Sequence, residues 1–258
     1  MKNSGRFVNH LAPFTALLAC ILIIGSLQQP RWKQLEHGDL SKNNFEQDNL
    51  NQQNYLRFWK SFPSFGYGNL LSDWIFLRFI QYYGDDPARN STGYQLSPQF
   101  LEEIIKYDHR FVQAYLTLSS AISIDAGLPN RSIELLGNGL KYISPNQTDA
   151  NYVWIYRATD QILFTNDIKG AKYSYNMAAD WADIAGNHRL ADANRKTANF
   201  ISNHPYSKKA RIGAWFLVFS RNQFSKTRLL ALNKIRQLGG TIKIQSNGKI
   251  MVSSPKEN

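Results

Sequence analysis

The stretch "NYVWIYRATDQILFTNDIKGAKYSYNMAADWA", Asn151–Ala182, indicates the fold more clearly than any other part of the chain. Its apolar residues recur every three or four positions in two runs, and an Asn-Asp pair separates the runs. This pattern predicts two amphipathic helices joined by a tight turn. In the second helix Ala171 and Ala178 lie seven positions apart, with the aromatic Tyr175 between them. Small residues let paired helices approach closely while an aromatic ring fills the groove, so we expect a helical hairpin.

Two earlier segments have a similar outline at a spacing of about 34 residues. The first is Ala114–Pro145, "AYLTLSSAISIDAGLPNRSIELLGNGLKYISP". The second pairs Gly68–Asp85, "GNLLSDWIFLRFIQYYGD", with Phe100–Phe111, "FLEEIIKYDHRF". Three imperfect copies of one hairpin predict an α-solenoid, in which each hairpin packs on its neighbours. The core-facing stripe expected on the helix within Gly68–Asp85 consists of Trp74, Leu77, Ile80 and Gln81.

The rest of the chain also shows mainly helical periodicity, followed by one β-prone segment. The expected helices are Asn69–Tyr83, Pro98–Tyr107, Phe111–Asp125, Asn130–Ile143, Ala150–Phe164, Ile168–Ile184, Arg189–Asn203, Ser207–Phe219 and Lys226–Leu238. Near the end, Thr241–Val252 places two short β-prone runs around Asn247-Gly248, a pair typical of a tight β-hairpin turn. The fold class predicted is therefore mainly α, an α-solenoid of helical hairpins with a small C-terminal β-hairpin.

The hairpin pattern resembles the tetratricopeptide repeat, whose second helix carries Ala, an aromatic four positions later and Ala three after that. Four segments of the chain are also similar in sequence to a group of cyanobacterial membrane-anchored proteins. They are "FGYGNLLSDWIFLRFIQYYGDD", "DHRFVQAYLTLS", "AGLPNRSIELLGNGL" and "RQLGG". The similarity covers about residues 56–245. It implies a tetratricopeptide-like fold and a photosynthetic or envelope membrane as the setting. The resemblance does not indicate which activity to expect, and it supplies no catalytic residues.

The N-terminal segment predicts a membrane association. Phe7–Pro30 contains no Asp, Glu, Lys or Arg, and its most apolar part, Leu11–Leu27, would form a helix of about 26 Å, near the minimum for crossing a bilayer. An uncleaved anchor, a cleaved signal peptide and a lipoprotein signal at Cys20 are the three interpretations. The apolar run continues past Cys20, which favours a single-pass transmembrane anchor. The basic residues of the short tail then place the bulk of the chain on the non-cytoplasmic side, in a periplasm or thylakoid lumen.

These features divide the chain into five parts. They are an anchor or signal (1–28), a polar tether (29–60), tetratricopeptide-like repeats (61–186), further basic helices (187–239) and the β-hairpin with its tail (240–258).

Positive charge is concentrated at the C-terminal end. Residues 185–258 carry 14 Lys and Arg against 2 Asp and Glu, whereas residues 1–184 carry 16 against 17. Such asymmetry indicates an acidic partner, an anionic lipid surface or nucleic acid, with a solubilising face as the alternative. The neighbouring aromatics Trp215, Phe216 and Phe219 are spaced like a helix core, so we expect no nucleic acid. The predicted basic surface consists of Lys208, Lys209, Arg211, Arg221, Lys226 and Arg228.

The sequence contains no recognisable catalytic, metal-binding or cofactor-binding motif. The five histidines have no ligand spacing, and Glu102 and Glu103 are adjacent, so they point apart on a helix. We therefore expect a non-enzyme without metal or cofactor, which binds a protein partner through the inner face of the repeats. The residues assigned to that face are Tyr82, Gln113, Tyr156 and Asp160, with ordinary packing or hydration as their alternative role. A basic structural protein of a lipid surface or envelope is the alternative function, and an enzyme is the third.

Overall fold

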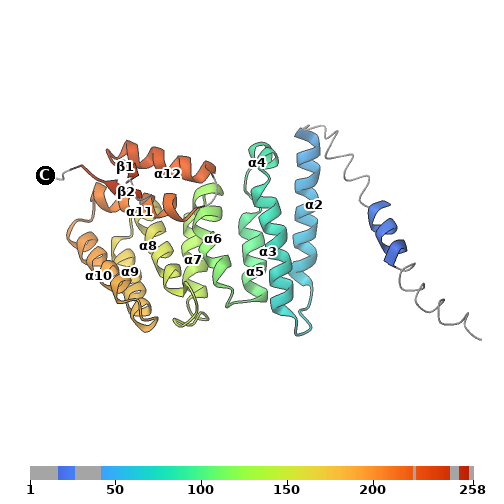
Figure 1. The fold of residues 1–258 in the computed structure, drawn as a ribbon, viewed down its shortest axis with the longest axis horizontal. Coiled ribbons are helices and arrows are strands. Elements are labelled where there is room, and N and C mark those ends of the chain that lie inside the picture. The colour runs from blue at the N-terminus through green and yellow to red at the C-terminus, as the bar shows by residue number, and fades with distance from the viewer. Residues whose placement is uncertain (1–16, 27–41, 223–224, 245–249, 256–258) are drawn as a thin grey trace, which may run out of the picture. The chain divides into compact units, whose positions relative to one another are not determined.

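The computed structural model describes residues 17–26, 42–222, 225–244 and 250–255. The chain divides into two compact units, Met1–Asp48 and Asn49–Asn258. Within the described residues the chain is mainly helical, with one two-stranded antiparallel sheet near its C-terminal end (Figure 1). The mainly helical class and the C-terminal hairpin are thus confirmed.

The helices follow one another along the second unit, and successive helices pack in pairs (Figure 1). Their bounds are α2 Lys42–Ser61, α3 Gly68–Gly84, α4 Asp86–Thr92, α5 Ser97–Tyr107, α6 Val112–Leu118, α7 Pro129–Gly139, α8 Ala150–Asp160, α9 Ile168–Ile184, α10 His188–Asn203, α11 Lys208–Arg221 and α12 Ser225–Gln237. Two π-helical turns, η1 (Ser119–Asp125) and η2 (Gln161–Thr165), continue α6 and α8. The main pairs are α3 with α5, α6–η1 with α7, α8 with α9, α9 with α10 and α11 with α12. All nine helices expected from the periodicity are present, with ends that differ by a few residues.

The polar tether expected over residues 29–60 is wrong for residues 42–60, which belong to helix α2. In the part of α2 that belongs to the second unit, Leu56 is buried and Trp59 packs against the core. The Tyr107 hydroxyl from α5 donates a hydrogen bond to the Trp59 carbonyl oxygen at 2.6 Å. A helix this polar stays ordered through tertiary contacts rather than through its own apolar stripe, so periodicity did not reveal it.

The core-facing stripe predicted for α3 is also wrong. The buried residues of α3 are Ser72, Ile75, Phe79, Tyr82 and Tyr83. By contrast, Trp74 and Leu77 are 55% and 59% exposed. Because the apolar residues of this helix occur on several of its faces, the 3.6-residue period alone did not identify the face that packs on α5.

Small residues do allow close approach between paired helices, as the sequence predicted. Ala171 and Ala178 of α9 are fully buried. A methyl group built on Gly139, the last residue of α7, would lie only 2.0 Å from Cε1 of Tyr115 in α6. The ring of Tyr115 therefore occupies the space that any larger residue at position 139 would need.

The C-terminal hairpin consists of β1 (Thr241–Ile244) and β2 (Ile250–Ser253). The strands pair in the register Thr241 with Ser253 and Ile242 with Val252. The predicted Asn-Gly turn lies outside the described residues. Ile242 and Val252 pack against the core of the second unit, which supports a hairpin too small to be stable alone.

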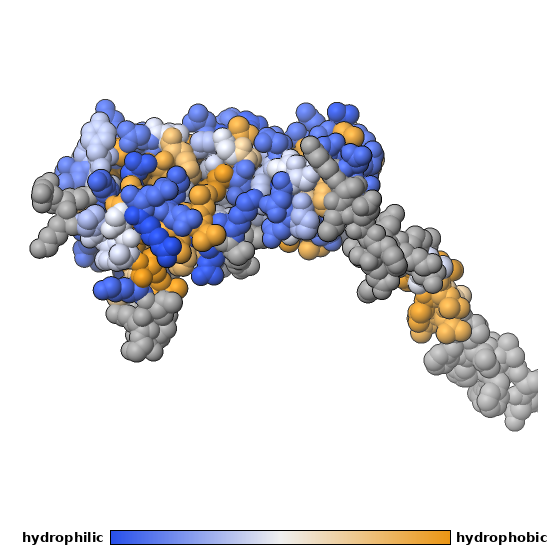
Figure 2. All heavy atoms as spheres, turned by 90° about the horizontal axis from the view of Figure 1, so that it is seen from above, coloured by the Kyte–Doolittle hydropathy of each residue, from blue (hydrophilic) through white to orange (hydrophobic). Residues whose placement is uncertain are grey.

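The first unit contains a helical segment over residues 17–26. Its side chains are exposed, and Figure 2 shows them as a continuous hydrophobic surface. Among the described residues, no helix combines the length and the hydrophobicity needed to cross a bilayer. The rest of the predicted anchor, residues 1–16 and 27–28, lies outside them.

Candidate functional site

The four residues assigned to the inner face do not form one site, and three of them are buried. Tyr82, Tyr156 and Asp160 are 4%, 8% and 0% exposed. Gln113 is exposed and lines a separate depression between α6 and the α7–α8 connection. The predicted partner-binding surface is therefore wrong for the three buried residues.

Tyr82 has a structural role at the α3–α5 junction. Its hydroxyl accepts a hydrogen bond from the Leu96 backbone N–H at 3.2 Å. The guanidinium of buried Arg89 lies 3.7 Å from its ring centroid. These contacts hold the α4 segment against α3, and burial raises the pKa of Tyr82.

Asp160 is the centre of a buried hydrogen-bond cluster. Its carboxylate accepts hydrogen bonds from the hydroxyls of Ser119 at 2.5 Å, Ser123 at 2.5 Å and Ser132 at 2.8 Å. Burial raises the pKa of Asp160 to about 6, although the three hydroxyl donors act in the opposite direction. The cluster joins α8 to η1 and α7, and the carboxylate has no exposed surface through which it could reach a substrate.

A groove formed by α8, α9, α10 and α11, here called the α8–α11 groove, combines apolar walls with charged groups. Its volume is about 640 Å³, within the range of protein ligand sites. Its lining residues are Tyr152, Ile155, Tyr175, Leu190, Asn194, Lys196, Thr197, Phe200, Lys209, Ala210, Gly213, Ala214, Leu217 and Arg221.

The sequence of α11 creates the space for this groove. Ala210, Gly213 and Ala214 occur at helical spacing on one side of the helix, so no long side chain fills the gap there. A methyl group built on Gly213 would have no heavy atom within 4 Å. On the opposite walls, Ile155 and Tyr175 are buried and present an apolar surface.

The charged groups of the groove all have one sign. Lys196, Lys209 and Arg221 are exposed, and no Asp or Glu is among the lining residues. The Arg221 guanidinium lies 4.0 Å from the ring centroid of Tyr152, and the Lys209 ammonium lies 5.1 Å from that of Phe200. The aromatic rings thus place positive charge along the groove.

The predicted basic surface is divided among several locations. Of its six residues, only Lys209 and Arg221 line the α8–α11 groove. The Lys226 ammonium donates a hydrogen bond to Asn90 Oδ1 at 3.3 Å. It therefore contacts α4, which does not line the groove. Arg228 lies over the ring of Phe219 at 4.9 Å, and Lys208 is exposed at the start of α11.

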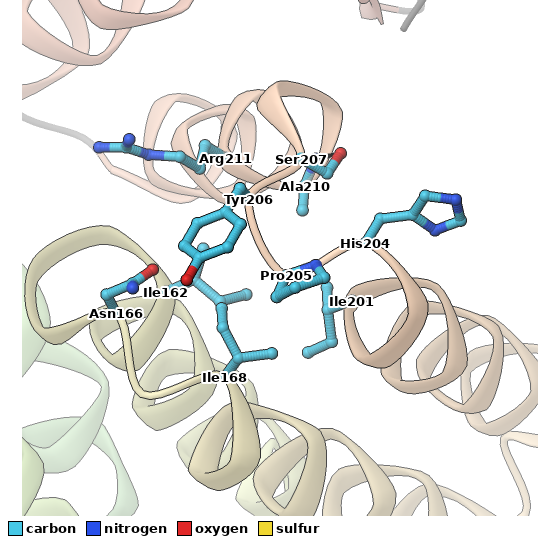
Figure 3. Close-up of a pocket in the computed structure, with 10 residues that line it drawn as sticks. All are labelled: Ile162, Asn166, Ile168, Ile201, His204, Pro205, Tyr206, Ser207, Ala210 and Arg211. Atoms are coloured by element: carbon cyan, nitrogen blue, oxygen red, sulfur yellow. Dashed lines mark hydrogen bonds between the residues drawn. The ribbon is translucent and has the colours of Figure 1, made fainter. Parts of the chain in front are cut away.

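Arg211 lines a smaller pocket of about 80 Å³ where the η2–α9 and α10–α11 connections meet (Figure 3). Tyr206 lies between Arg211 and Asn166 in Figure 3, whereas His204 points away from the pocket. A space of this size holds only a few water molecules. Within the described residues, no three His, Cys, Asp or Glu side chains are grouped closely enough to hold a metal ion.

Sequence reasoning missed Asn194, Lys196, Phe200 and Gly213 as groove residues. Leu190, Asn194 and Thr197 lie at spacing four and three on α10, so helical geometry alone places them on one face. Their common environment depends on how α10 packs against α9 and α11, which periodicity does not give.

Comparison with known protein families, with curated proteins and with solved structures gives no match for this chain. The resemblance to tetratricopeptide-repeat proteins therefore stays a prediction. The mainly helical fold with its small antiparallel sheet stands on the structure itself.

Proposed function

We propose that this chain is a non-enzymatic, membrane-anchored scaffold of tetratricopeptide-like helical hairpins that binds a protein partner through the α8–α11 groove. The observation that carries the proposal is the groove itself. Four helices contribute an apolar floor, and charges of one sign border it. Grooves between packed helices commonly hold a segment of another polypeptide.

The packing of the hairpins supports the tetratricopeptide-like part of the proposal. Successive helix pairs contact their neighbours along the second unit, as in helical repeats. Small residues occur at the close contacts, with Gly139 against Tyr115 and with Ala171 and Ala178 buried in α9.

The sequence of Phe7–Pro30 supports the membrane-anchored part, because it has no charged side chain. An anchored scaffold fits a role in the assembly or maintenance of a membrane complex, photosynthetic or envelope. The groove would then bind one of its components.

The experiment is affinity capture of the tagged chain from solubilised native membranes, comparing the original sequence with Gly213→Leu. A Cβ atom at position 213 has no heavy atom within 4 Å, so the new side chain would extend into open groove space. The matched control is Gly84→Leu at the end of α3, where the surroundings are equally open. We expect a partner that is captured by the original chain and by Gly84→Leu but is lost with Gly213→Leu. Identical captured proteins for all three chains would contradict the proposal.

A further inference from the structure

Asn194 is the most informative residue of the α8–α11 groove. It lies in the middle of α10, is 5% exposed and lines the groove. Its amide nitrogen is buried and has no hydrogen-bond partner among the described residues. Because a buried donor without a partner destabilises the fold, such a group favours a partner from outside the chain.

The chemistry of a primary amide restricts what that partner can be. The side chain of Asn both donates and accepts, which matches a peptide unit of another polypeptide. In a helix most main-chain carbonyl oxygens are already paired within the helix, whereas an extended segment presents them unpaired. An extended segment is therefore the better complement to Asn194.

The charges of the groove restrict the ligand further. Lys196 on α10 and Lys209 and Arg221 on α11 are exposed along the groove, which has no acidic lining residue. A positive groove attracts acidic segments and repels basic ones. The small residues Ala210, Gly213 and Ala214 leave room between these charges for one large apolar side chain.

We propose that the α8–α11 groove binds an extended, acidic segment of a partner protein, with Asn194 pairing with its main chain and an apolar side chain seated over Gly213. This inference rests on the proposed function and specifies the class of ligand. The three cations would face Asp or Glu side chains that flank the apolar residue.

The test is selection of random peptides displayed on phage against the purified 258-residue chain, with Gly213→Leu as the counter-target. Peptides retained by the first chain and not by the second depend on the groove. We expect these peptides to carry net negative charge and a large apolar residue, and to keep binding when a central proline excludes a helix. Asn194→Leu should weaken their binding about fivefold, the equivalent of one hydrogen bond of about 1 kcal/mol. Lys196→Gln should weaken it about threefold and reduce its dependence on salt.

The outcomes separate this inference from the proposed function. Groove-dependent peptides that are neutral or basic, or that require a helix, would overturn the inference and leave a protein-binding groove. The absence of any groove-dependent peptide would overturn both. A further outcome is that no peptide is selected and that anionic phosphatidylglycerol vesicles bind the original chain but not Gly213→Leu. This result would identify a lipid surface as the occupant and would overturn both the inference and the proposed function. Circular dichroism of each variant confirms that the helices are retained.

Discussion

The guanidinium of Arg221, at the C-terminal end of α11, lies 4.0 Å from the ring centroid of Tyr152 in the first turn of α8. The two residues are far apart in sequence, and their contact joins a central hairpin to the basic C-terminal helices. It also borders the α8–α11 groove, which both residues line. One contact therefore links the arrangement of the helices to the charge of the proposed binding site.

Removing this contact should cost little stability. In a double-mutant cycle with Arg221→Ala and Tyr152→Ala, we expect a coupling energy of about 0.5–1 kcal/mol in the free energy of unfolding, because the site is open to solvent. Denaturation in urea measures it. Arg221→Lys keeps the charge but loses the planar stacking group, so it should lose part of that coupling. A coupling energy of zero would show that the stacking does not contribute to stability.

Two glycines in helices should respond oppositely to alanine. Gly213→Ala should stabilise the fold by about 0.5–1 kcal/mol, because its methyl group meets open space and alanine favours a helix. Gly139→Ala should destabilise it by about 1–3 kcal/mol, because the methyl group would lie 2.0 Å from Tyr115 Cε1. Thermal and urea unfolding of the two variants gives both values. Equal effects of the same sign would contradict the packing of α7 on α6.

The buried Asp160 should make the stability depend on pH. Its pKa is raised from 3.8 to about 6 in the folded chain, so between these values the folded state binds more protons than the unfolded state. The contribution of Asp160 to stability is therefore fully present below pH 3.8 and is lost as pH rises through about 6. The change amounts to about 3 kcal/mol.

Asp160→Asn should remove this dependence. We expect the stability difference between the original chain and Asp160→Asn to change by up to about 3 kcal/mol between pH 4 and pH 7, measured by urea unfolding. The matched change Ser132→Ala removes one hydroxyl donor to the carboxylate and should raise the pKa of Asp160 further. A difference independent of pH would show that Asp160 has an ordinary pKa.

The two faces of α3 should differ sharply in their tolerance of substitution. Ile75→Ala should cost about 2–5 kcal/mol, since Ile75 is fully buried. Trp74→Gln, one position away and 55% exposed, should change the free energy of unfolding by less than about 0.5 kcal/mol. Substantial destabilisation by Trp74→Gln would instead support the core-facing stripe that the sequence predicted for α3.

The hairpins were predictable because their determinants are local. Turns rich in Gly, Pro, Asn and Asp separate the periodic runs, and small residues such as Ala171 mark the close contacts of paired helices. The terminal β-hairpin was predictable for the same reason. In each case the residues that determine the element lie within it.

The failures concern which side of a helix faces which neighbour. Helix α3 is apolar on several sides, so the choice between Trp74 and Ile75 for the core depended on the packing of α5. Asp160 was expected to face a partner, yet serines from η1 and α7 surround its carboxylate. The π-helical turns η1 and η2 also depart from the 3.6-residue period that the prediction used.

The central claim is that the α8–α11 groove holds a segment of another protein, and site-specific photocrosslinking tests it most directly. A benzoylphenylalanine placed at position 200, where it replaces the groove-lining Phe200, is compared with one at position 173, where Tyr173 is 55% exposed and does not line the groove. After irradiation of native membranes, we predict a discrete adduct with a partner protein from position 200 and none of the same mass from position 173. No adduct from position 200, or the same adduct from both positions, would contradict the claim.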